Sequence, residues 1–413
     1  MTLAMHGYVH EDFKEVADEL AKQLSGDGAG GAAACVYHRG QRVVDIWAGK
    51  RDVVNEWESD TMCLSFSTTK GVMATLVHIL ADRGLIDYEA PVAKYWPEFA
   101  QGGKGAITVR QVLCHQAGLY PIRSLIDHAD RVLEWEYMTR TLAAASPAPA
   151  SLRSGYHGIT WGWLVGELIR RVTNQSLHDA LRTLLTEPLE LDGAFIGAPV
   201  ETRGRVAALI EPTFAPKTLW TRVRMWFVQA MCFFLRLDPG LAKEALLPKG
   251  CKEVYFSSRM LDAEVPAMNG VFTARSLARI YAMLAAGGEL DGKRYLSAET
   301  IKEATVVQSW RLDSVVGFPM RWRLGYHLVG TSRGILRGGF GHFGYGGSGA
   351  WADPERELSF AMTLNRVAGT PFGDMRMVRM GGIVTRCAEK RTKKLRASSG
   401  AQGHGSHEAE MRA

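Results

Sequence analysis

Ser67 and Lys70 place a hydroxyl and an amine one helical turn apart in the run Ser67-Thr68-Thr69-Lys70. Residues i and i+3 share one face of a helix, so these two side chains can meet. A serine hydroxyl becomes a strong nucleophile only when a nearby base accepts its proton, and a desolvated lysine can accept it. The pattern alone is weak, because a serine followed three residues later by a lysine is expected about once in a chain of this length.

The sequence after the motif predicts the helix that would hold it. Apolar residues recur at helical spacing, and Gly84 follows the last of them, where a glycine suits the left-handed helix cap. Farther along, Thr108 and Gln111 have the spacing of a capping box, which predicts a short second helix that Gly118 can close. The recurring apolar residues of the first helix are Val72, Leu76, Ile79 and Leu80.

Strand patterns lie at both ends of the chain, and helical patterns dominate between them. This order favours an α+β fold in which one antiparallel sheet is built from both ends of the chain. The strand-like runs are residues 32–38, 41–48, 324–329, 350–352 and 358–365, and the clearest later helical patterns are residues 157–172 and 274–286.

The segments around Ser67 also carry a resemblance. Together, Leu64-Ser65-Phe66-Ser67-Thr68-Thr69-Lys70-Gly71, Tyr95-Trp96-Pro97-Glu98-Phe99 and Ile107-Thr108-Val109-Arg110-Gln111 resemble the serine β-lactamase-like superfamily. The likeness is strongest to the family VIII carboxylesterases, which look like class C β-lactamases and DD-peptidases, and S-x-x-K is their first motif. It extends from near Val36 to about Asn365, with a less familiar stretch around residues 200–255.

The resemblance implies a β-lactamase/transpeptidase-like fold with an antiparallel sheet flanked by helices. The sheet would come from about residues 30–66 and 305–387, a mostly helical region from about 67–304, and the active site would lie between them. A single serine hydrolase domain would then span residues 1–387, and residues 388–413 would form a disordered basic tail.

A third catalytic group is implied by resemblance at Tyr156, in the run Arg153-Ser154-Gly155-Tyr156-His157-Gly158. Lysine and tyrosine side chains are both protonated in neutral solution, but partial desolvation and mutual proximity can shift their pKa values. Such a coupled pair can pass protons between a nucleophile and a leaving group. The alternative for Tyr156 is a half-buried tyrosine bonded to the main chain.

The last motif is His342-Phe343-Gly344, where β-lactamases have K-T-G and family VIII esterases often have H-x-G or W-x-G. The resemblance implies that Gly344 lets the main chain approach a bound acyl group, and that the amides of Tyr345 and Ser67 form an oxyanion hole. Loss of the K-T-G lysine argues against efficient penicillin hydrolysis, and Gly158 departs from the asparagine of a Y-x-N motif. For His342, simple packing or substrate binding is as favoured as direct catalysis.

Two glycine-rich patterns are not expected to carry function. Gly330-Thr331-Ser332-Arg333-Gly334 matches the G-x-S-x-G elbow of other hydrolases, but no helix pattern follows it, so Ser332 is predicted to be a turn residue. Gly344-Tyr345-Gly346-Gly347-Ser348-Gly349 matches G-x-G-x-x-G but does not open a helix, which excludes a dinucleotide site. Metal-binding motifs are also missing, so no cofactor and no metal is expected.

Composition indicates an ordinary globular protein of 413 residues with 46% hydrophobic residues. Half of the net charge of +6 belongs to residues 388–413, so nucleic acid is not an expected partner. The N-terminus lacks a signal-peptide pattern and the six cysteines form no C-x-x-C pair, so a cytoplasmic location is expected.

Trp220–Leu235 is the most apolar stretch, but its uncharged part is too short to cross a bilayer. It could form a buried helix, an apolar cap over an acyl pocket, or a peripheral membrane contact. The oligomeric state cannot be read from the sequence.

These observations favour a carboxylesterase that cleaves short- to medium-chain acyl esters with Ser67, Lys70 and Tyr156. A D-amino-acid peptidase, an amidase, a weak β-lactamase or an acyltransferase would keep the same serine and change the substrate. A non-catalytic scaffold of the same fold is the less favoured alternative.

Overall fold

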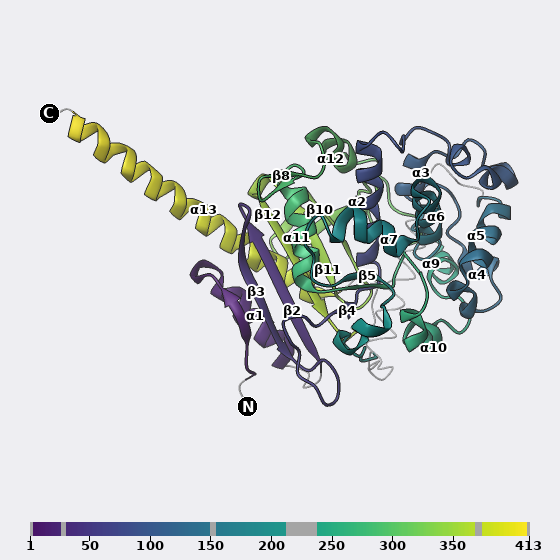
Figure 1. Cartoon of the computed structure of the whole chain (residues 1–413), viewed down its shortest axis with the longest axis horizontal. Helices are drawn as coiled ribbons and strands as arrows, with labels where there is room; N and C mark the ends of the chain where they lie inside the picture. The colour runs from purple at the N-terminus through teal and green to yellow at the C-terminus, as the bar shows by residue number, and fades with distance from the viewer. Residues whose placement is uncertain (1–2, 26–29, 149–153, 212–237, 368–373, 411–413) are drawn as a thin grey trace.

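A computed structural model describes residues 3–25, 30–148, 154–211, 238–367 and 374–410, with side chains described through Ser398. A central sheet and a large helical region lie side by side, and one long helix extends away from both (Figure 1). The expected α+β fold, with an antiparallel sheet formed by both ends of the chain, is confirmed.

The main sheet has seven antiparallel strands in the order β1-β3-β2-β12-β11-β10-β9. Strand β2 pairs with β12 from Ala32↔Leu364 to His38↔Leu358, so the first and last parts of the domain are hydrogen-bonded neighbours. The strands are β1 His6–Val9, β2 Gly31–His38, β3 Gln41–Gly49, β9 His327–Thr331, β10 Gly334–Phe343, β11 Gly349–Asp353 and β12 Leu358–Leu364.

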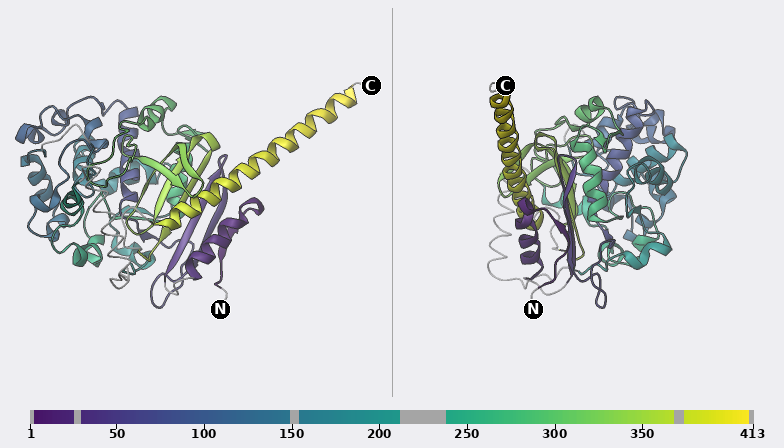
Figure 2. Two further views of the ribbon diagram at one scale, coloured as in Figure 1. Left: turned by 180° about the vertical axis from the view of Figure 1, so that it is seen from behind. Right: turned by 60° about the vertical axis from the view of Figure 1, so that its left-hand side comes forward.

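Helices cover both faces of this sheet (Figure 2). Helices α1 and α13 pack on one face around Phe13, Phe360 and Met380, and α11 packs on the other, where the largest apolar core continues into the helical region. The helices are α1 Lys14–Ser25, α2 Thr68–Asp82, α3 Val109–Leu113, α4 Ile122–Leu125, α5 Trp135–Ala144, α6 Trp161–Thr173, α7 Leu177–Leu181, α9 Pro239–Leu246, α10 Cys251–Tyr255, α11 Ala274–Ala285, α12 Ala298–Thr305 and α13 Met375–Glu410.

The predicted limits of the sheet were wrong at both ends. Strand β1 extends the sheet to His6, well before residue 30, and residues 375–387 belong to α13 rather than to the sheet. A small antiparallel sheet, in the order β4-β6-β5, joins the end of the first sheet segment to the mostly helical region, which also holds a short hairpin, β7–β8. These strands are β4 Cys63–Leu64, β5 Ala194–Ile196, β6 Gly270–Phe272, β7 Glu289–Leu290 and β8 Lys293–Arg294.

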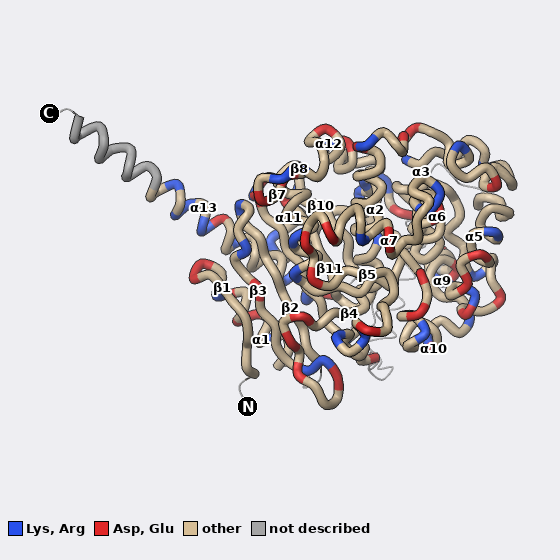
Figure 3. Tube along the Cα trace, viewed as in Figure 1, with Lys and Arg blue, Asp and Glu red and all other residues tan. Residues whose placement is uncertain are grey.

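The prediction of a disordered tail from residue 388 was also wrong. Helix α13 continues through this point, and Ala388 and Arg391 are buried. The Arg391 guanidinium donates to His38 Nδ1 at 3.0 Å and to Gln41 Oε1 at 2.5 Å, which attaches the helix to β2 and β3. Figure 3 colours the positions of the basic residues along this part of α13 blue, and Lys390 pairs with Glu15 of α1. The tail was mispredicted because the sequence does not show that Arg391 is buried against β2 and β3, or that the more exposed Lys390 and Lys394 pair with carboxylates near the N-terminus.

None of the helices in the described part of the chain is long and apolar enough to span a membrane. The apolar segment 220–235 lies outside the described residues, so its three predicted roles stay predictions.

Candidate active site

Ser67 lies at the start of α2, immediately after a sharp turn that leaves β4. Phe66 makes this turn with a φ of 47°, a left-handed conformation that non-glycine residues adopt at a cost. The Phe66 ring is nevertheless buried, and it packs edge-on against Tyr345. The Thr69 hydroxyl accepts a hydrogen bond from the Gly270 amide at 2.9 Å and ties the first turn of α2 to β6. The start of the helix is therefore held in place by contacts from β6 and from the loop that follows β10.

The structure brings the three residues predicted to be catalytic into direct contact. Ser67 Oγ lies 3.0 Å from Lys70 Nζ and 2.8 Å from the Tyr156 hydroxyl. Lys70 Nζ also lies 5.1 Å from the centre of the Tyr156 ring. Ser67 is half-buried, whereas Lys70 is fully buried and Tyr156 is 4% exposed. Ser67 is therefore partly exposed, and the two groups that exchange protons with it are buried.

Lys70 lies among main-chain carbonyls, and none of its hydrogen-bond partners in the described structure is a carboxylate. Its Nζ donates to Gly158 O at 2.7 Å and to Ala267 O at 2.9 Å. Burial lowers the pKa of Lys70 well below its ordinary value, because desolvation penalises the ammonium form. A neutral amine has two protons and one lone pair, so the two carbonyls take both protons and the lone pair is left for the Ser67 hydroxyl.

Tyr156 completes the network from the other side of the serine. Burial raises the pKa of its phenol, while the hydrogen bond to Ser67 opposes that rise. The neutral phenol donates its proton to Ser67 Oγ, and when Lys70 is in its neutral form the Ser67 hydroxyl donates to its lone pair. This ordered arrangement of neutral groups can move a proton from serine to lysine when the oxygen attacks a substrate.

Asp313 and Trp322 hold Tyr156 in place, and neither was expected from the sequence. Asp313 Oδ1 accepts hydrogen bonds from the amides of Tyr156, Val315 and Val316, and Oδ2 accepts from Trp322 Nε1 at 2.8 Å. The Trp322 indole stacks on the Tyr156 ring with 5.4 Å between centroids and 12° between planes. Asp313 lies between α12 and β9, far from every motif, so only tertiary structure reveals the contact.

The end of β10 lies against the start of α2. Thr68 Oγ1 donates to Ser348 O at 3.0 Å, and the Gly344 amide donates to the same oxygen at 2.7 Å. A Cβ at Gly344 would lie 2.2 Å from Ser65 O, so only glycine permits this approach. Among the described residues, the amides of Ser67 and Tyr345 have no hydrogen-bond acceptor. Two unpaired N–H groups next to a nucleophile can bind a developing oxyanion.

His342 is a predicted site residue whose contacts in the described structure do not include Ser67. It is 2% exposed, its Cβ would be 3.3 Å from a Cβ placed on Gly71, and its ring lies 6.3 Å from that of Tyr156. Nδ1 contacts Phe343 O at 3.2 Å, and Nε2 has no partner in the described structure. Burial lowers its pKa well below the ordinary value, so the ring is neutral. The packing role is the one this position fits.

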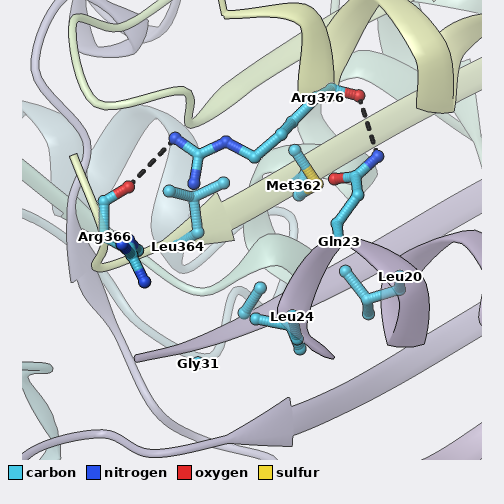
Figure 4. A pocket seen from close by; sticks show the side chains of 9 residues that line it. Leu20, Gln23, Leu24, Gly31, Met362, Leu364, Arg366 and Arg376 are labelled. Carbon is cyan, nitrogen blue, oxygen red and sulfur yellow. Dashed lines mark hydrogen bonds between the residues drawn. The ribbon is translucent and has the colours of Figure 1, made fainter. Parts of the chain in front are cut away.

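Arg376 fixes the loop that follows the H-x-G motif. Its Nη2 donates to Gly346 O and to Arg366 O, both at 3.0 Å, while Asp374 pairs with the same guanidinium. Figure 4 shows the Arg366 contact and a second one, in which the Gln23 amide donates to Arg376 O. The cavity beside these residues is about 20 Å³, roughly the room for one water and too small for a substrate.

The surroundings of Gly158 explain the missing asparagine of the Y-x-N motif, and those of Ser332 show that it is a turn residue. A Cβ on Gly158 would lie 2.0 Å from Leu246 Cδ2 of α9, so the leucine occupies the space that an asparagine of a Y-x-N motif would need. Ser332 lies in the turn between β9 and β10, where its amide donates to Val378 O at 2.9 Å, and no helix follows. The expectation that Ser332 is a turn residue is confirmed.

Comparison with known proteins relates this arrangement to an established family. The family model described as Beta-lactamase matches residues 17–380. The chain is 41% identical over 368 residues to the esterase/beta-lactamase LipL of Mycobacterium tuberculosis, covering 86% of this chain and 81% of that protein.

Two solved structures are also similar. A family VIII carboxylesterase has 33% identity and a TM-score of 0.80 over 93% of this chain and 100% of its own. A penicillin-binding protein homologue from Caulobacter crescentus has 34% identity and a TM-score of 0.80, with the same coverage.

Proposed function

The chain belongs to the β-lactamase family, and we propose that it is a serine hydrolase that cleaves short- to medium-chain carboxylic esters through an acyl-enzyme on Ser67. The observation that carries the proposal is the contact of Ser67 Oγ with both Lys70 Nζ and the Tyr156 hydroxyl. A half-exposed serine with a buried, neutral amine at 3.0 Å is the arrangement of an activated nucleophile.

In the proposed reaction, Ser67 Oγ attacks the ester carbonyl and Lys70 Nζ takes its proton. The amides of Ser67 and Tyr345 bind the oxyanion that forms. Tyr156 then gives its proton to the leaving alcohol and is reprotonated by Lys70. The C–O bond to the alcohol breaks at this step. Water, deprotonated by the same pair, attacks the acyl-enzyme and releases the carboxylic acid.

Two features favour esters over β-lactams. The K-T-G lysine that would hold a β-lactam carboxylate is replaced by His342, which is buried and neutral. The space for a Y-x-N asparagine is occupied by Leu246. In addition, Tyr156 belongs to an apolar cluster that suits an acyl chain or an apolar alcohol. Its other members are Tyr120, Ala245, Val315, Met320 and Trp322, with Leu241, Ala242 and Leu246 packed against them.

β-Lactam hydrolysis is the second candidate, because the relative LipL is described as both an esterase and a β-lactamase. Weak turnover is its expected form here, since the acylation network is present and the carboxylate-binding lysine is not. The remaining alternatives are an amidase, a D-amino-acid peptidase and an acyltransferase. A non-catalytic scaffold would not need a lysine buried without a counter-charge beside a serine.

The experiment compares hydrolysis of p-nitrophenyl esters from acetate to laurate by the wild type and by Ser67→Ala, with nitrocefin in parallel. We expect ester turnover with the wild type, a loss of at least about 10³-fold in Ser67→Ala, and little nitrocefin cleavage. Nitrocefin turnover that exceeds ester turnover would replace the esterase with the β-lactamase. Ester turnover that survives in Ser67→Ala would exclude Ser67 as the nucleophile.

A further inference from the structure

A second pocket lies at the edge of the main sheet, apart from Ser67. It has a volume of about 300 Å³, near the lower limit for small-molecule sites. Its walls come from the segment after α12, the segment before β9, edge strand β9 and the neighbouring strand β10. We call it the arginine pocket, and it is lined by Val307, Trp310, Arg321, Arg323, Leu328, Ile335, Leu336 and Arg337.

Three of these residues are arginines, and no aspartate or glutamate is among the lining residues. Within the described part of the chain, none of Arg321, Arg323 and Arg337 forms an ion pair. Other arginines of the molecule differ, since Arg110 contacts two carboxylates and Arg356 contacts three. The pocket therefore concentrates positive charge that the described protein does not neutralise.

Arg323 is the strongest part of this observation, because it is only 3% exposed. Its Nε donates to Thr305 O at 2.8 Å and its Nη2 to Arg337 O at 3.3 Å, but Nη1 is buried without any partner in the described structure. Burial and the nearby charge of Arg321 lower the pKa of Arg323 to about 10, so the group remains charged at neutral pH. A buried, charged and uncompensated guanidinium is costly unless an anion accompanies it.

A bulge in β10 positions Arg337, and a ring contact positions Arg321. The pairing of β9 with β10 shifts register between Leu336 and Phe340, and Arg337 lies in this bulge, where its carbonyl accepts from Arg323. Bulges commonly redirect side chains near functional sites. Arg321 lies over the ring of Trp310 at 4.9 Å, and that ring is 68% exposed. Guanidinium, indole and aliphatic side chains thus share one concave surface.

The apolar part of the lining indicates that the bound anion also has an apolar portion. Trp310 and Ile335 are exposed large hydrophobic residues, and Leu328, Leu336 and Val307 complete the wall. A fully hydrated inorganic anion would leave these side chains without a partner, whereas an amphiphilic anion would cover them.

We propose that the arginine pocket binds a small organic anion, with a carboxylate or phosphate head at the guanidinium groups of Arg321, Arg323 and Arg337 and an apolar body against Trp310 and Ile335. The planar fork of arginine matches both head groups through paired hydrogen bonds. The site is independent of the ester chemistry at Ser67, so either proposal can fail without the other.

The pocket also lies directly behind the catalytic region. Trp322, between Arg321 and Arg323 in sequence, packs against Tyr156 and His342, while the two arginines line the pocket. Binding is therefore measured directly, and variants of the pocket arginines distinguish a ligand of the arginine pocket from a ligand of the active site.

The test is isothermal titration of the full-length protein with four probes: octanoate, octyl phosphate, 1-octanol and acetate. We expect saturable binding of octanoate or octyl phosphate, whichever head group the site prefers, and binding at least about tenfold weaker for 1-octanol and acetate. Arg323→Met should weaken the preferred ligand about tenfold or more. Because Arg323 also bonds two carbonyls and its loss could disturb folding, the double variant Arg321→Ala/Arg337→Ala is measured as well, and the same weakening is expected.

Arg333→Ala is the matched control, because Arg333 lies in the β9–β10 turn outside the pocket and pairs with Glu389. It removes the same charge and should leave binding unchanged. Equal binding of 1-octanol would show that no anion is recognised. Binding that is unchanged in Arg323→Met and in the double variant, or weakened equally in Arg333→Ala, would overturn the assignment, as would failure of both octyl anions to bind.

Discussion

At the scale of single residues, Lys70 has a protonation state set by its position. It has the serine hydroxyl and two main-chain carbonyls as partners, and desolvation drives its pKa down. The same burial drives the pKa of Tyr156 up. Burial therefore favours the neutral form of both groups, which would leave the lysine a lone pair to accept a proton and the tyrosine a proton to give. The sequence alone could not separate these two roles.

A pH–rate profile tests this division of roles. The neutral amine is the active form, so kcat/KM should rise with pH through the depressed pKa of Lys70, well below the ordinary lysine value of about 10.4. His115, His157 and His342 face the same groups, but burial lowers their pKa values and keeps them neutral over this range. The profile is measured with p-nitrophenyl butyrate for the wild type and Tyr156→Phe.

The variant should be slower, with the rise at nearly the same pH, since Lys70 remains. A rise that disappears in Tyr156→Phe would make a Tyr156 phenolate the base.

Asp313 is predicted to be a positioning residue for Tyr156. In Asp313→Asn, an amide NH₂ would replace Oδ2 and face the Trp322 N–H, so two donors would meet. We expect kcat to fall about tenfold or more, with KM little changed and unfolding easier by about 2 kcal/mol. Besides burial, the charge of Asp313 raises the pKa of Tyr156, so the alkaline limb of the pH–rate profile should move to lower pH.

A merely structural role would lower stability without that movement. Trp322→Phe supplies the comparison, because it loses the indole N–H and keeps the Asp313 charge, so its alkaline limb should stay in place.

At the scale of elements, the site is assembled by the start of α2 and the end of β10. The expected strands, the capping box at Thr108 and Gln111, and the helix after Ser67 were all readable from periodicity and capping residues. The small sheet β4-β6-β5 was not, because its strands have only two or three residues and too little sequence for a pattern. The hydrogen bond between Asp313 and the Tyr156 amide could not be predicted from the sequence either, because the two residues are 157 positions apart.

Gly344→Ala tests the contact between these two elements. The new Cβ would lie 2.2 Å from Ser65 O, a main-chain atom that cannot move without displacing the start of α2. We expect activity to fall about 10²-fold or more and the melting temperature to drop. The matched control is Gly330→Ala on β9, where a Cβ would meet nothing within 4 Å. Both variants are measured by ester hydrolysis and thermal unfolding. Comparable losses in the two would show that the close contact between Gly344 and Ser65 O has no special role.

At the scale of the whole molecule, strands from both ends of the chain form one sheet. The antiparallel sheet and its origin in both termini could be predicted, because strand patterns flank the helical patterns. The extent of α13 could not, since its charged sequence looks like a solvated tail until the carboxylates of Asp12 and Glu15 are placed beside it. The composition of the segment gives its charge but does not show which carboxylates form ion pairs with it.

Truncation separates the packed and projecting parts of α13. A chain that ends after Ser398 keeps Ala388 and Arg391 and should retain its melting temperature and activity. A chain that ends after Arg386 loses the buried residues and the bonds of Arg391 to His38 and Gln41, and should be destabilised by about 3 kcal/mol or more. Thermal unfolding of the two chains measures the difference, and equal stability would show that the packing of residues 387–391 contributes little.

The central claim is that Ser67 is the nucleophile, and covalent trapping tests it most directly. The protein is treated with a fluorophosphonate, and the site of attachment is found by peptide mass spectrometry in the wild type, Ser67→Ala and Ser332→Ala. We predict a single adduct on Ser67 in the wild type and in Ser332→Ala, and no adduct in Ser67→Ala. An adduct on another serine, or a wild type that does not react, would contradict the account.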